Sequence, residues 1–240
     1  MKIDILAFGA HPDDVELAAS GTLIKAARGG SMTGLITLSR GEMGTRGTVE
    51  MRADEFEKSS RIMGLSVHEM LSLPDGRLAS DQISREAVVR KIREYRPAII
   101  LLPYWEDRHP DHCAASRIVQ ESAFLSGLRK LDTGQEPHRP AELIYYMASW
   151  EFEPSFVVDI SEHFAQKQAV LRCYASQVHN PDRGICEPGT LISSGQYWEL
   201  LTARAAHYGR LIGKAYGEPF RIRGLVEIAD LLAAFGGRTY

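Results

Sequence analysis

Two short clusters of histidine and aspartate are the residues of this 240-residue chain best suited to chemistry. The first is His-Pro-Asp-Asp at residues 11–14, and the second is His-Pro-Asp-His at residues 109–112. Imidazole nitrogens and carboxylate oxygens are good ligands for Zn²⁺, and a catalytic zinc site uses three protein ligands and keeps one position open. His11 and Asp14 are close enough in sequence to reach one ion, and His112 would supply the third ligand. Together the clusters predict a metal centre.

Helix capping is the main alternative for either cluster taken alone. Asp13 or Asp14 near the start of a helix would accept hydrogen bonds from free backbone amides and would interact favourably with the helix dipole. Capping needs one short polar residue, however, and it does not require three histidines. We therefore favour metal binding. Two histidines and one carboxylate suit Zn²⁺ and also Fe²⁺, Mn²⁺ or Co²⁺, so the pattern leaves the identity of the metal open.

Each cluster follows a predicted buried strand, the first after two residues and the second after six. These two strands lie at residues 3–8 and 98–102, where apolar residues predominate. Further strands are predicted at residues 33–38, 70–73 and 156–160, and helices at residues 15–27, 51–63, 83–95 and 112–124. Strands that alternate with helices in this way predict an α/β fold of the Rossmann-like kind, with a mostly parallel, twisted sheet and helices on both faces. Because ligands bind outside the carboxyl ends of such strands, both clusters are expected to face one crevice.

The rest of the chain is predicted to complete the same unit. Residues 128–140 are polar and contain proline and glycine, which is typical of a surface loop. Residues 196–216 and 226–235 are predicted to be helical, so the C-terminal part is expected to be mainly helical. The sequence shows neither an internal repeat nor a low-complexity segment. A single domain over residues 1–240 is therefore expected.

The composition is that of an ordinary globular protein and excludes several classes. Hydrophobic residues make up 44% of the chain and charged residues 25%, and the net charge of −3 does not favour nucleic acid or anionic lipid. The three cysteines form no CxxC pair, which argues against a disulfide framework or a thiolate zinc site. No apolar stretch approaches the roughly 20 residues of a membrane span, and Asp4 lies where a signal peptide would be apolar. We predict a cytoplasmic protein that acts on a small molecule and binds neither nucleic acid nor membrane.

The segments AHPDDVE and HPDH resemble the PIG-L/LmbE-type de-N-acetylases. That family consists of zinc-dependent enzymes that remove the acetyl group from N-acetylglucosamine attached to another moiety. Further segments resemble the branch that serves bacterial thiol biosynthesis, and together they span nearly the whole chain: LITLSRGEMGTRGT, MRADEFEKSSRIMG, LPDGRL, RPAIILLPYWEDRHPDH, YASQ, ARAAHYG and GEPFR. The resemblance implies a hydrolase that deacetylates N-acetyl-α-D-glucosaminyl L-malate on the way to bacillithiol. It also implies a homo-oligomer, since relatives often form one.

The same resemblance implies the three metal ligands named above and assigns roles to their neighbours. Hydrolysis at a metal needs a carboxylate that is not itself a ligand, to accept the proton of the attacking water, and Asp13 fits this general base. His109 would be the general acid or the electrophile that stabilises the oxyanion. Asp111 would either orient one of the histidines or cap the helix that follows. Asp107 is interpreted as structural or as a contact to sugar hydroxyls.

The glycine-rich loop at residues 39–48 is the predicted substrate-binding element, because it follows a strand at the same edge of the sheet. A malate group carries carboxylates, which arginine binds through two parallel hydrogen bonds. Arg46 and Arg52 are the preferred candidates, with Arg108 and Glu42 as further ones. For each arginine, an ordinary solvated side chain is the competing interpretation.

Three other functions compete with this prediction. The substrate could be another N-acetylglucosamine conjugate, such as chitobiose or a thiol adduct. Metal-assisted phosphoester hydrolysis would more often need a second metal and hence more carboxylates, and no third acidic cluster is present. A metal-dependent sugar-binding module would not need Asp13, a carboxylate beyond the three ligands.

Overall fold

The computed structural model describes residues 1–178 and 189–237, and its centre is one seven-stranded sheet with the order β3-β2-β1-β4-β5-β7-β6. Strands β3, β2, β1, β4 and β5 run parallel. Strand β7 is antiparallel to both β5 and β6. The strands are β1 (Ile5–Gly9), β2 (Thr33–Thr37), β3 (Val67–Met70), β4 (Ile99–Pro103), β5 (Glu142–Tyr146), β6 (Phe156–Asp159) and β7 (Gly217–Arg221).

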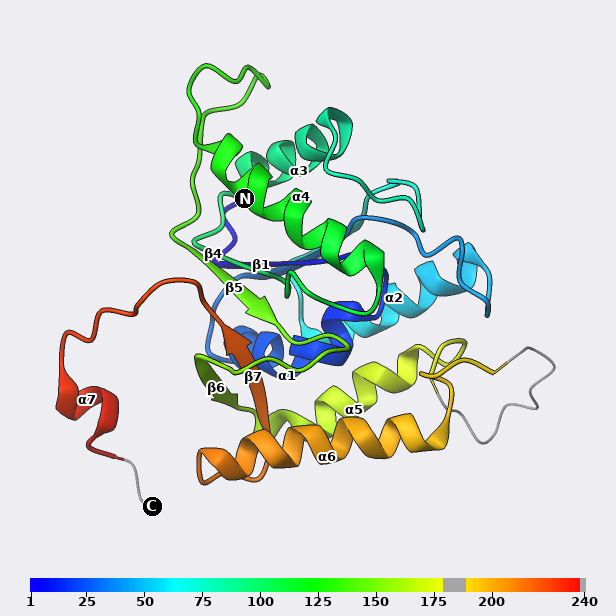
Figure 1. The fold of residues 1–240 in the computed structure, drawn as a ribbon, viewed down its shortest axis with the longest axis vertical. Coiled ribbons are helices and arrows are strands. Elements are labelled where there is room, and N and C mark those ends of the chain that lie inside the picture. The colour runs from blue at the N-terminus through cyan, green and yellow to red at the C-terminus, as the bar shows by residue number, and fades with distance from the viewer. Residues whose placement is uncertain (179–188, 238–240) are drawn as a thin grey trace.

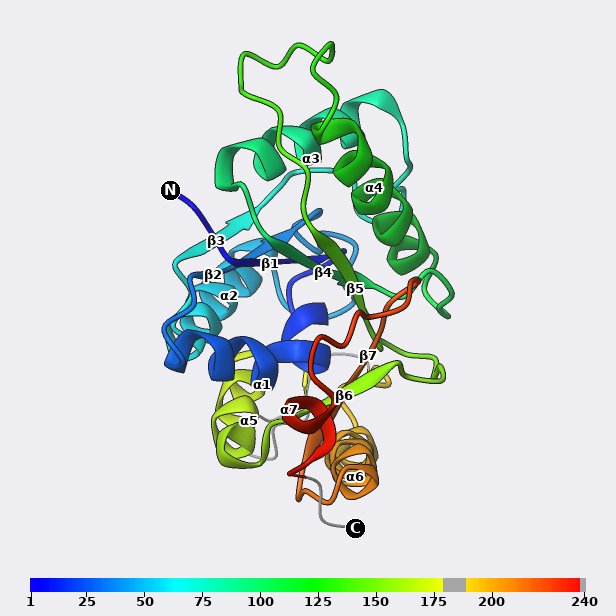
Figure 2. The same cartoon turned by 90° about the vertical axis from the view of Figure 1, so that its left-hand side faces the viewer.

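Helices cover both faces of this sheet, as Figures 1 and 2 show. Helices α3 and α4 pack together on one face, and α1, α2 and α5 pack together on the other. Helix α6 packs against β7 at the antiparallel end of the sheet. The helices are α1 (Asp14–Arg28), α2 (Val49–Met63), α3 (Gln82–Tyr95), α4 (Pro110–Ser126), α5 (Phe164–Cys173), α6 (Gly195–Leu211) and α7 (Leu231–Phe235), with a 3₁₀ turn at Ser161–His163.

The two faces of the sheet carry separate apolar cores because successive side chains of a strand point to opposite sides. In β1, Leu6 and Phe8 belong to the core shared with α3 and α4. Ala7 belongs to the core on the opposite face, together with Val15 and Leu23 of α1. All five side chains are fully buried. Strand β1 is thus buried on both faces, which explains its nearly continuous apolar sequence.

The chain changes direction across the sheet next to β1. Strand β1 pairs with β2 on one side and with β4 on the other, so the connections that follow β1 and β4 diverge from adjacent strand ends. Such a switch point opens a crevice at the carboxyl ends of the strands. Residues 11–14 follow β1 and residues 109–112 follow β4, so the fold brings both clusters to this crevice.

The predicted fold class is confirmed: the sheet is mostly parallel and helices lie on both of its faces. The prediction missed β5, β7 and α5, and it placed β3 at residues 70–73 instead of Val67–Met70. Strand β7 was missed because Glu218 and Pro219 are unusual inside a strand. Glu218 is nevertheless buried, because it accepts hydrogen bonds from the backbone N–H groups of Gly21 and Thr22 and from Lys167 Nζ.

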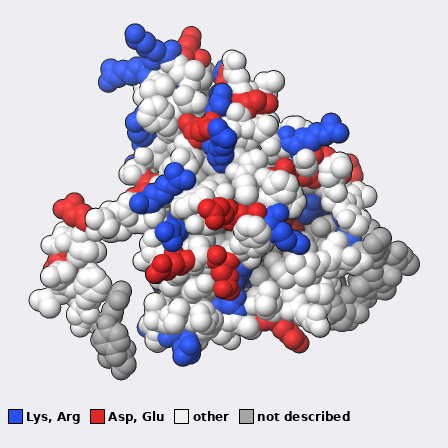
Figure 3. Space-filling model, viewed as in Figure 1, with Lys and Arg blue, Asp and Glu red and all other residues white. Residues whose placement is uncertain are grey.

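The C-terminal residues differ from the predicted helix at residues 226–235. Only Leu231–Phe235 form a helix, and residues 223–237 are exposed along their whole length. This C-terminal arm extends away from the sheet and its helices in Figure 1. Within the described residues, no helix combines the length and apolar character needed to cross a membrane. Lysine, arginine, aspartate and glutamate are intermixed over the face in Figure 3, without a large area of one sign.

Candidate metal centre

His11, Asp14 and His112 come together at the crevice, as their sequence pattern predicts. Asp14 Oδ1 lies 3.1 Å from His112 Nε2, and Asp14 Oδ2 lies 3.5 Å from His11 Nδ1. One potential ligand atom from each residue lies within 4.8 Å of the others. The three residues are 7–8% exposed, so a bound ion would be shielded from bulk water but reachable from one side. The donor set of two imidazoles and one carboxylate fits a divalent zinc-like ion.

Two further carboxylates hold the histidines in the orientation that ligation needs. Asp107 Oδ1 accepts a hydrogen bond from His112 Nδ1 at 2.9 Å, which leaves Nε2 directed toward Asp14. Asp75 Oδ1 lies 2.9 Å from His11 Nε2, which leaves Nδ1 directed toward Asp14. A ligand histidine commonly donates its other ring N–H to a carboxylate, which fixes the tautomer and the ring orientation. Asp107 therefore has the structural role that the sequence left open.

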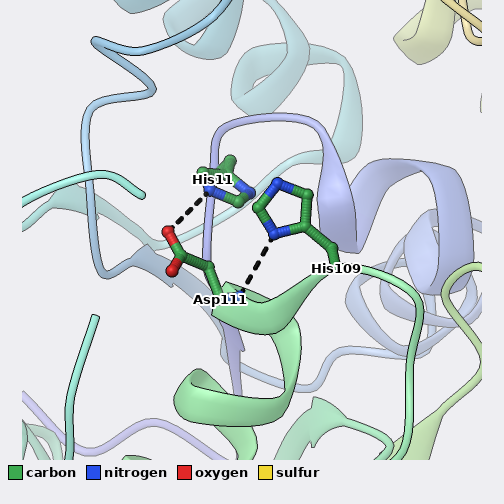
Figure 4. A group of neighbouring side chains, drawn as sticks. All are labelled: His11, His109 and Asp111. Carbon is green, nitrogen blue, oxygen red and sulfur yellow. Dashed lines mark hydrogen bonds and ion pairs between the residues drawn. The ribbon is translucent and has the colours of Figure 1, made fainter. Parts of the chain in front are cut away.

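A second group of possible ligands contains His11, His109 and Asp111, which Figure 4 shows as sticks. Asp111 Oδ2 lies 3.4 Å from His11 Nε2, but the same carboxylate also accepts hydrogen bonds from the backbone N–H groups of Gly76 (2.7 Å) and Leu78 (3.3 Å). These contacts already use the oxygens of Asp111. The group of His11, Asp14 and His112 is therefore the better metal site, and Asp111 helps to orient His11 through the ring nitrogen Nε2.

Helix capping at the second cluster is carried out by His109 and not by Asp111. His109 occupies the N-cap position of α4, and its Nδ1 accepts a hydrogen bond from the backbone N–H of Asp111 at 3.2 Å. The proposed cap role of Asp111 is therefore wrong. Because Nδ1 is an acceptor here, the proton of a neutral His109 resides on Nε2 and is available to a ligand in the cavity.

Asp13 differs from Asp14 in both backbone and side chain. Its φ of 113° is left-handed, a conformation that is strained for a residue other than glycine and that often occurs at functional sites. Asp13 is the N-cap residue of α1, yet its side chain makes no capping hydrogen bond. Its Oδ2 accepts a hydrogen bond from Arg52 Nη2 at 3.2 Å. The turn therefore separates the two neighbouring carboxylates, one toward the histidines and one toward Arg52.

Burial and charge set the protonation states of this site. Burial raises the pKa of Asp13 to about 6, even though the charge of Arg52 opposes this shift. Burial disfavours the charged forms of His11 and His112, but the negative charge of Asp14 and the hydrogen bonds to the surrounding carboxylates together outweigh it and raise their pKa values to about 12 and about 10. Positive charge beside it thus stabilises the buried, ionised carboxylate of Asp14. A divalent cation would supply the same positive charge, which is a further reason why these residues fit a metal.

Burial and the charges of His11 and His112 lower the pKa of His109. At neutral pH this imidazole is therefore mainly uncharged. A neutral imidazole donates a hydrogen bond well but is a poor source of a full proton. Of the two roles predicted for His109, its electrostatic surroundings favour the electrophile that stabilises an oxyanion.

A cavity of about 380 Å³ opens beside the metal ligands. Asp13 and His109 line it, together with the loop residues Met43, Gly44 and Thr45. The C-terminal part of the chain also lines it: Thr190, Leu191, Ile192, Tyr197, Leu200, Leu201 and Arg204. The cavity therefore combines both histidine-aspartate clusters with a wall from a region whose role the sequence did not indicate.

The four residues predicted to bind substrate have different positions. Arg108 lines the cavity and is exposed. Arg52 also lines it, but its guanidinium donates hydrogen bonds to the carbonyl oxygens of Gly41 and Pro12 and to Asp13. Arg46 is 3% exposed and does not belong to the described cavity lining. The backbone carbonyl of Arg46 accepts a hydrogen bond from Gln177, which ties the loop to the segment after α5.

Glu42, the fourth candidate, also lies outside the described lining, and its carboxylate accepts a hydrogen bond from the backbone N–H of Asp75 at 2.9 Å. Sequence reasoning missed Asp75, Gln177, Tyr197 and Arg204 as members of the site. The available signal for Asp75 was its place after a predicted strand, at the same sheet edge as the two clusters.

A buried carboxylate lies one helical turn beyond Asp13. Glu16 is fully buried, and it accepts hydrogen bonds from the hydroxyl groups of Tyr174 and Ser59. Burial raises the pKa of Glu16 to about 7 in spite of these hydrogen bonds. The folded protein therefore disfavours the ionised form of Glu16, so this group favours folding most at low pH and loses that contribution as pH rises through about 7.

The Glu16→Gln variant is expected to be less sensitive to alkaline pH than the wild-type protein. Because glutamine cannot ionise, the stability of the variant relative to wild type should rise between pH 5 and pH 8, on the order of 3 kcal/mol from the pKa shift. Urea unfolding at the two pH values measures this change. Glu50→Gln, at an exposed helix position, is the control and should show no such rise. Parallel stability profiles for wild type and Glu16→Gln would contradict the buried-acid interpretation.

Known proteins share this arrangement over most of the chain. Residues 6–123 match the family model described as PIG-L, GlcNAc-PI de-N-acetylase. The diacetylchitobiose deacetylase of Thermococcus kodakarensis is 28% identical over 232 residues, which cover 90% of this chain and 82% of that protein.

Solved structures agree with the sequence match. The conserved protein TT1542 from Thermus thermophilus has a TM-score of 0.85 and 36% identity, with 95% of this chain and 98% of that chain covered. The N,N'-diacetylchitobiose deacetylase from Pyrococcus horikoshii has a TM-score of 0.79 and 26% identity, with 91% and 83% covered. The matched segment contains both histidine-aspartate clusters. The chain therefore contains a PIG-L family domain at residues 6–123.

Proposed function

We propose that this protein is a metal-dependent hydrolase that removes the acetyl group from an N-acetylglucosamine conjugate. The observation that carries the proposal is the placement of Asp13. This buried carboxylate lines the cavity beside the three ligand residues but contacts Arg52 and not the histidines. A binding module has no use for such a carboxylate. The two deacetylases named above, which act on diacetylchitobiose, support the same reaction class.

The metal expected at His11, Asp14 and His112 is Zn²⁺, with Fe²⁺, Mn²⁺ or Co²⁺ as alternatives. When bound, such an ion polarises an acetamide carbonyl and lowers the pKa of water. Family membership and the donor set support zinc.

The residues around the ligands supply the general base and the hydrogen-bond donor of the reaction. Asp13 accepts a proton from the attacking water, whose oxygen forms a bond to the acetamide carbon. His109 donates a hydrogen bond from Nε2 to the carbonyl oxygen, on which negative charge builds up. The carbon–nitrogen bond then breaks, and the nitrogen receives the proton carried by Asp13. Acetate and a free amine are the products. Arg52 keeps the unreacted Asp13 ionised by its positive charge.

We further propose N-acetyl-α-D-glucosaminyl L-malate as the substrate and bacillithiol biosynthesis as the context. Two arginines of the cavity lining support this substrate, because a guanidinium can bind a malate carboxylate: Arg108, which is exposed, and Arg204, which is half-buried. Chitobiose or a thiol adduct of N-acetylglucosamine is the alternative substrate. Leu191 and Leu200 of the same wall would favour a less polar conjugate.

A panel of N-acetylglucosamine conjugates, carrying malate, inositol, a second sugar or a thiol adduct, tests the substrate. Release of free amine is expected to be fastest for the malate conjugate and to fall at least about tenfold for Arg108→Ala, the loss of one charge-assisted contact of roughly 1.5 kcal/mol. Equal turnover of the neutral conjugates would exclude malate and leave the deacetylase proposal intact. No amine release from any conjugate would overturn the reaction class.

Phosphoester hydrolysis is the second candidate reaction. It would favour two adjacent ions, but the two possible ligand groups of the described residues share His11, and Asp111 is already used by backbone amides. Release of acetate without phosphate from model substrates separates the two reactions. Phosphate release would reverse this choice.

The chain is also proposed to act as one domain, in the cytoplasm, and as a homo-oligomer. The C-terminal arm supports self-association, because Leu225, Leu231 and Leu232 are 69–102% exposed and large apolar exposures are typical of interaction sites. Sedimentation of the full chain and of a chain ending at Arg223 tests this point. The full chain should form a larger species than the shortened one; two monomers would contradict it.

A further inference from the structure

Asp75 is a buried carboxylate that the metal ligands and the substrate loop share. It lies in the turn after β3 and is 8% exposed. Its Oδ1 lies 2.9 Å from His11 Nε2, and its Oδ2 accepts a hydrogen bond from the backbone N–H of Met43 at 2.8 Å. His11 belongs to the metal site, whereas Met43 belongs to the loop that lines the cavity. One side chain thus joins two parts of the site.

The turn and the loop are connected in both directions. The backbone N–H of Asp75 donates a hydrogen bond to Glu42 Oε1 at 2.9 Å, next to the bond from Met43 to Asp75. The next residue, Gly76, donates its backbone N–H to Asp111 Oδ2 at 2.7 Å. The turn that contains Asp75 is therefore anchored to the loop on one side and to the second cluster on the other.

We propose that Asp75 is a positioning residue that couples metal binding at His11 to the arrangement of residues 43–45 in the cavity wall. This inference rests on the metal site of the proposed function, but not on the identity of the substrate. It predicts that metal binding orders the loop, and by reciprocity that an ordered loop strengthens metal binding.

The carboxylate is required because both of its oxygens act as acceptors at once. His11 must carry its proton on Nε2 so that Nδ1 is free for the metal, and Asp75 Oδ1 accepts that proton's hydrogen bond. Met43 simultaneously donates to Oδ2. Asparagine has a single acceptor oxygen. If that oxygen accepts from Met43, the amide NH₂ faces His11 Nε2 and favours a proton on Nδ1, the nitrogen that the metal needs.

The alternative orientation of the asparagine amide keeps the contact with His11 but loses the hydrogen bond from Met43. If its oxygen accepts from His11, the amide NH₂ faces the backbone N–H of Met43, and two donors then oppose each other. Asp75→Asn must therefore lose either the metal-competent tautomer of His11 or the hydrogen bond to the loop. Asp111 also contacts His11, but its other contacts run to Gly76 and Leu78 and not to the loop, so its substitution does not break a direct link between His11 and the loop.

Zn²⁺ affinity, measured by competition with a chelator, and amide hydrogen exchange of residues 42–46 test the coupling without any substrate. Wild-type protein should exchange these amides more slowly with Zn²⁺ than without it. Asp75→Asn should bind Zn²⁺ about 10–100-fold more weakly, the usual cost of losing a residue that orients a ligand, and its loop exchange should no longer respond to Zn²⁺.

Two further variants separate the effect on Zn²⁺ affinity from the effect on loop exchange. Asp111→Asn should weaken Zn²⁺ binding but keep the response of the loop, since Asp75 still joins His11 and Met43. Glu42→Gln should keep both, because glutamine Oε1 can still accept from the backbone N–H of Asp75 and only the exposed 3.3 Å contact from the backbone N–H of Arg40 is lost. The proposal is overturned if Asp75→Asn retains wild-type Zn²⁺ affinity, or if wild-type loop exchange is the same with and without Zn²⁺. The second outcome is decisive even if the variant does not fold.

Discussion

Asp13→Asn is expected to lower the turnover number about 10²–10⁴-fold, the contribution typical of a general base, while the protein retains its metal. Asparagine has nearly the same shape as aspartate but cannot accept the proton of the attacking water. Asp13 is not a ligand in the proposed arrangement, since its carboxylate contacts Arg52. Turnover and metal content must therefore be measured on the same preparation. Full activity with metal in place would show that Asp13 is not the base.

The backbone at Asp13 makes asparagine the suitable replacement. Asparagine tolerates a positive φ better than most residues, whereas alanine at φ 113° would add strain to the loss of the base. Asp13→Gly relieves the strain and provides the control for it. Both variants should fold and should be equally inactive within about tenfold, because neither carries a base. A glycine variant much more active than the asparagine variant would mean that backbone geometry, and not the carboxylate, limits turnover.

The same residue sets an expected pH dependence. A general base works only when ionised, so turnover should fall as the pH drops through the pKa of Asp13, which burial raises to about 6. Arg52 opposes this rise. Arg52→Gln should therefore move the acidic limb of the pH profile to higher pH. The profile must be recorded at saturating metal, so that loss of metal at low pH does not produce a similar limb. An unchanged limb in the Arg52 variant would remove Asp13 from this role.

Asp14→Ala is expected to abolish metal binding and activity together. Asp14 lies between the two histidines and is the only carboxylate of the proposed ligand set. Its removal should weaken Zn²⁺ binding by more than the roughly 10–100-fold expected for a residue that only orients a ligand. Asp107→Asn is the matched comparison, because Asp107 contacts the far nitrogen of His112 and should produce that smaller loss.

Metal removal provides the complementary measurement. A chelator should abolish the activity of wild-type protein, and added Zn²⁺ should restore it, whereas Asp14→Ala should not respond to either. The variant is expected to fold, since loss of Asp14 also removes the charge that raises the pKa values of His11 and His112. An Asp14→Ala protein that keeps metal and turnover would invalidate the ligand set.

Local sequence determined the class of the fold and the chemical nature of the site. The strands that precede both clusters are apolar because they are buried on both faces, and this pattern is visible without a structure. His11 and Asp14 lie shortly after β1, and His112 lies at the start of the helix that follows β4, so the parallel sheet brings their side chains together. The family resemblance rested on the same residues, which is why the family was predicted correctly.

Only the tertiary structure decided which carboxylates support the ligands and which arginines face the cavity. Asp75 reaches His11 because β3, β2 and β1 are neighbours in the sheet, a relation that the spacing of residues along the chain does not encode. Arg52 was predicted to contact substrate; it lines the cavity, and its guanidinium also donates hydrogen bonds to Asp13 and to the carbonyl oxygens of Pro12 and Gly41. Strand β7 could not be predicted for the same reason. Glu218 is buried in this strand only because Gly21 and Lys167, which are distant in sequence, donate hydrogen bonds to its carboxylate. Periodicity and spacing report interactions along the chain, whereas these roles arise from contacts between segments that the sheet brings together.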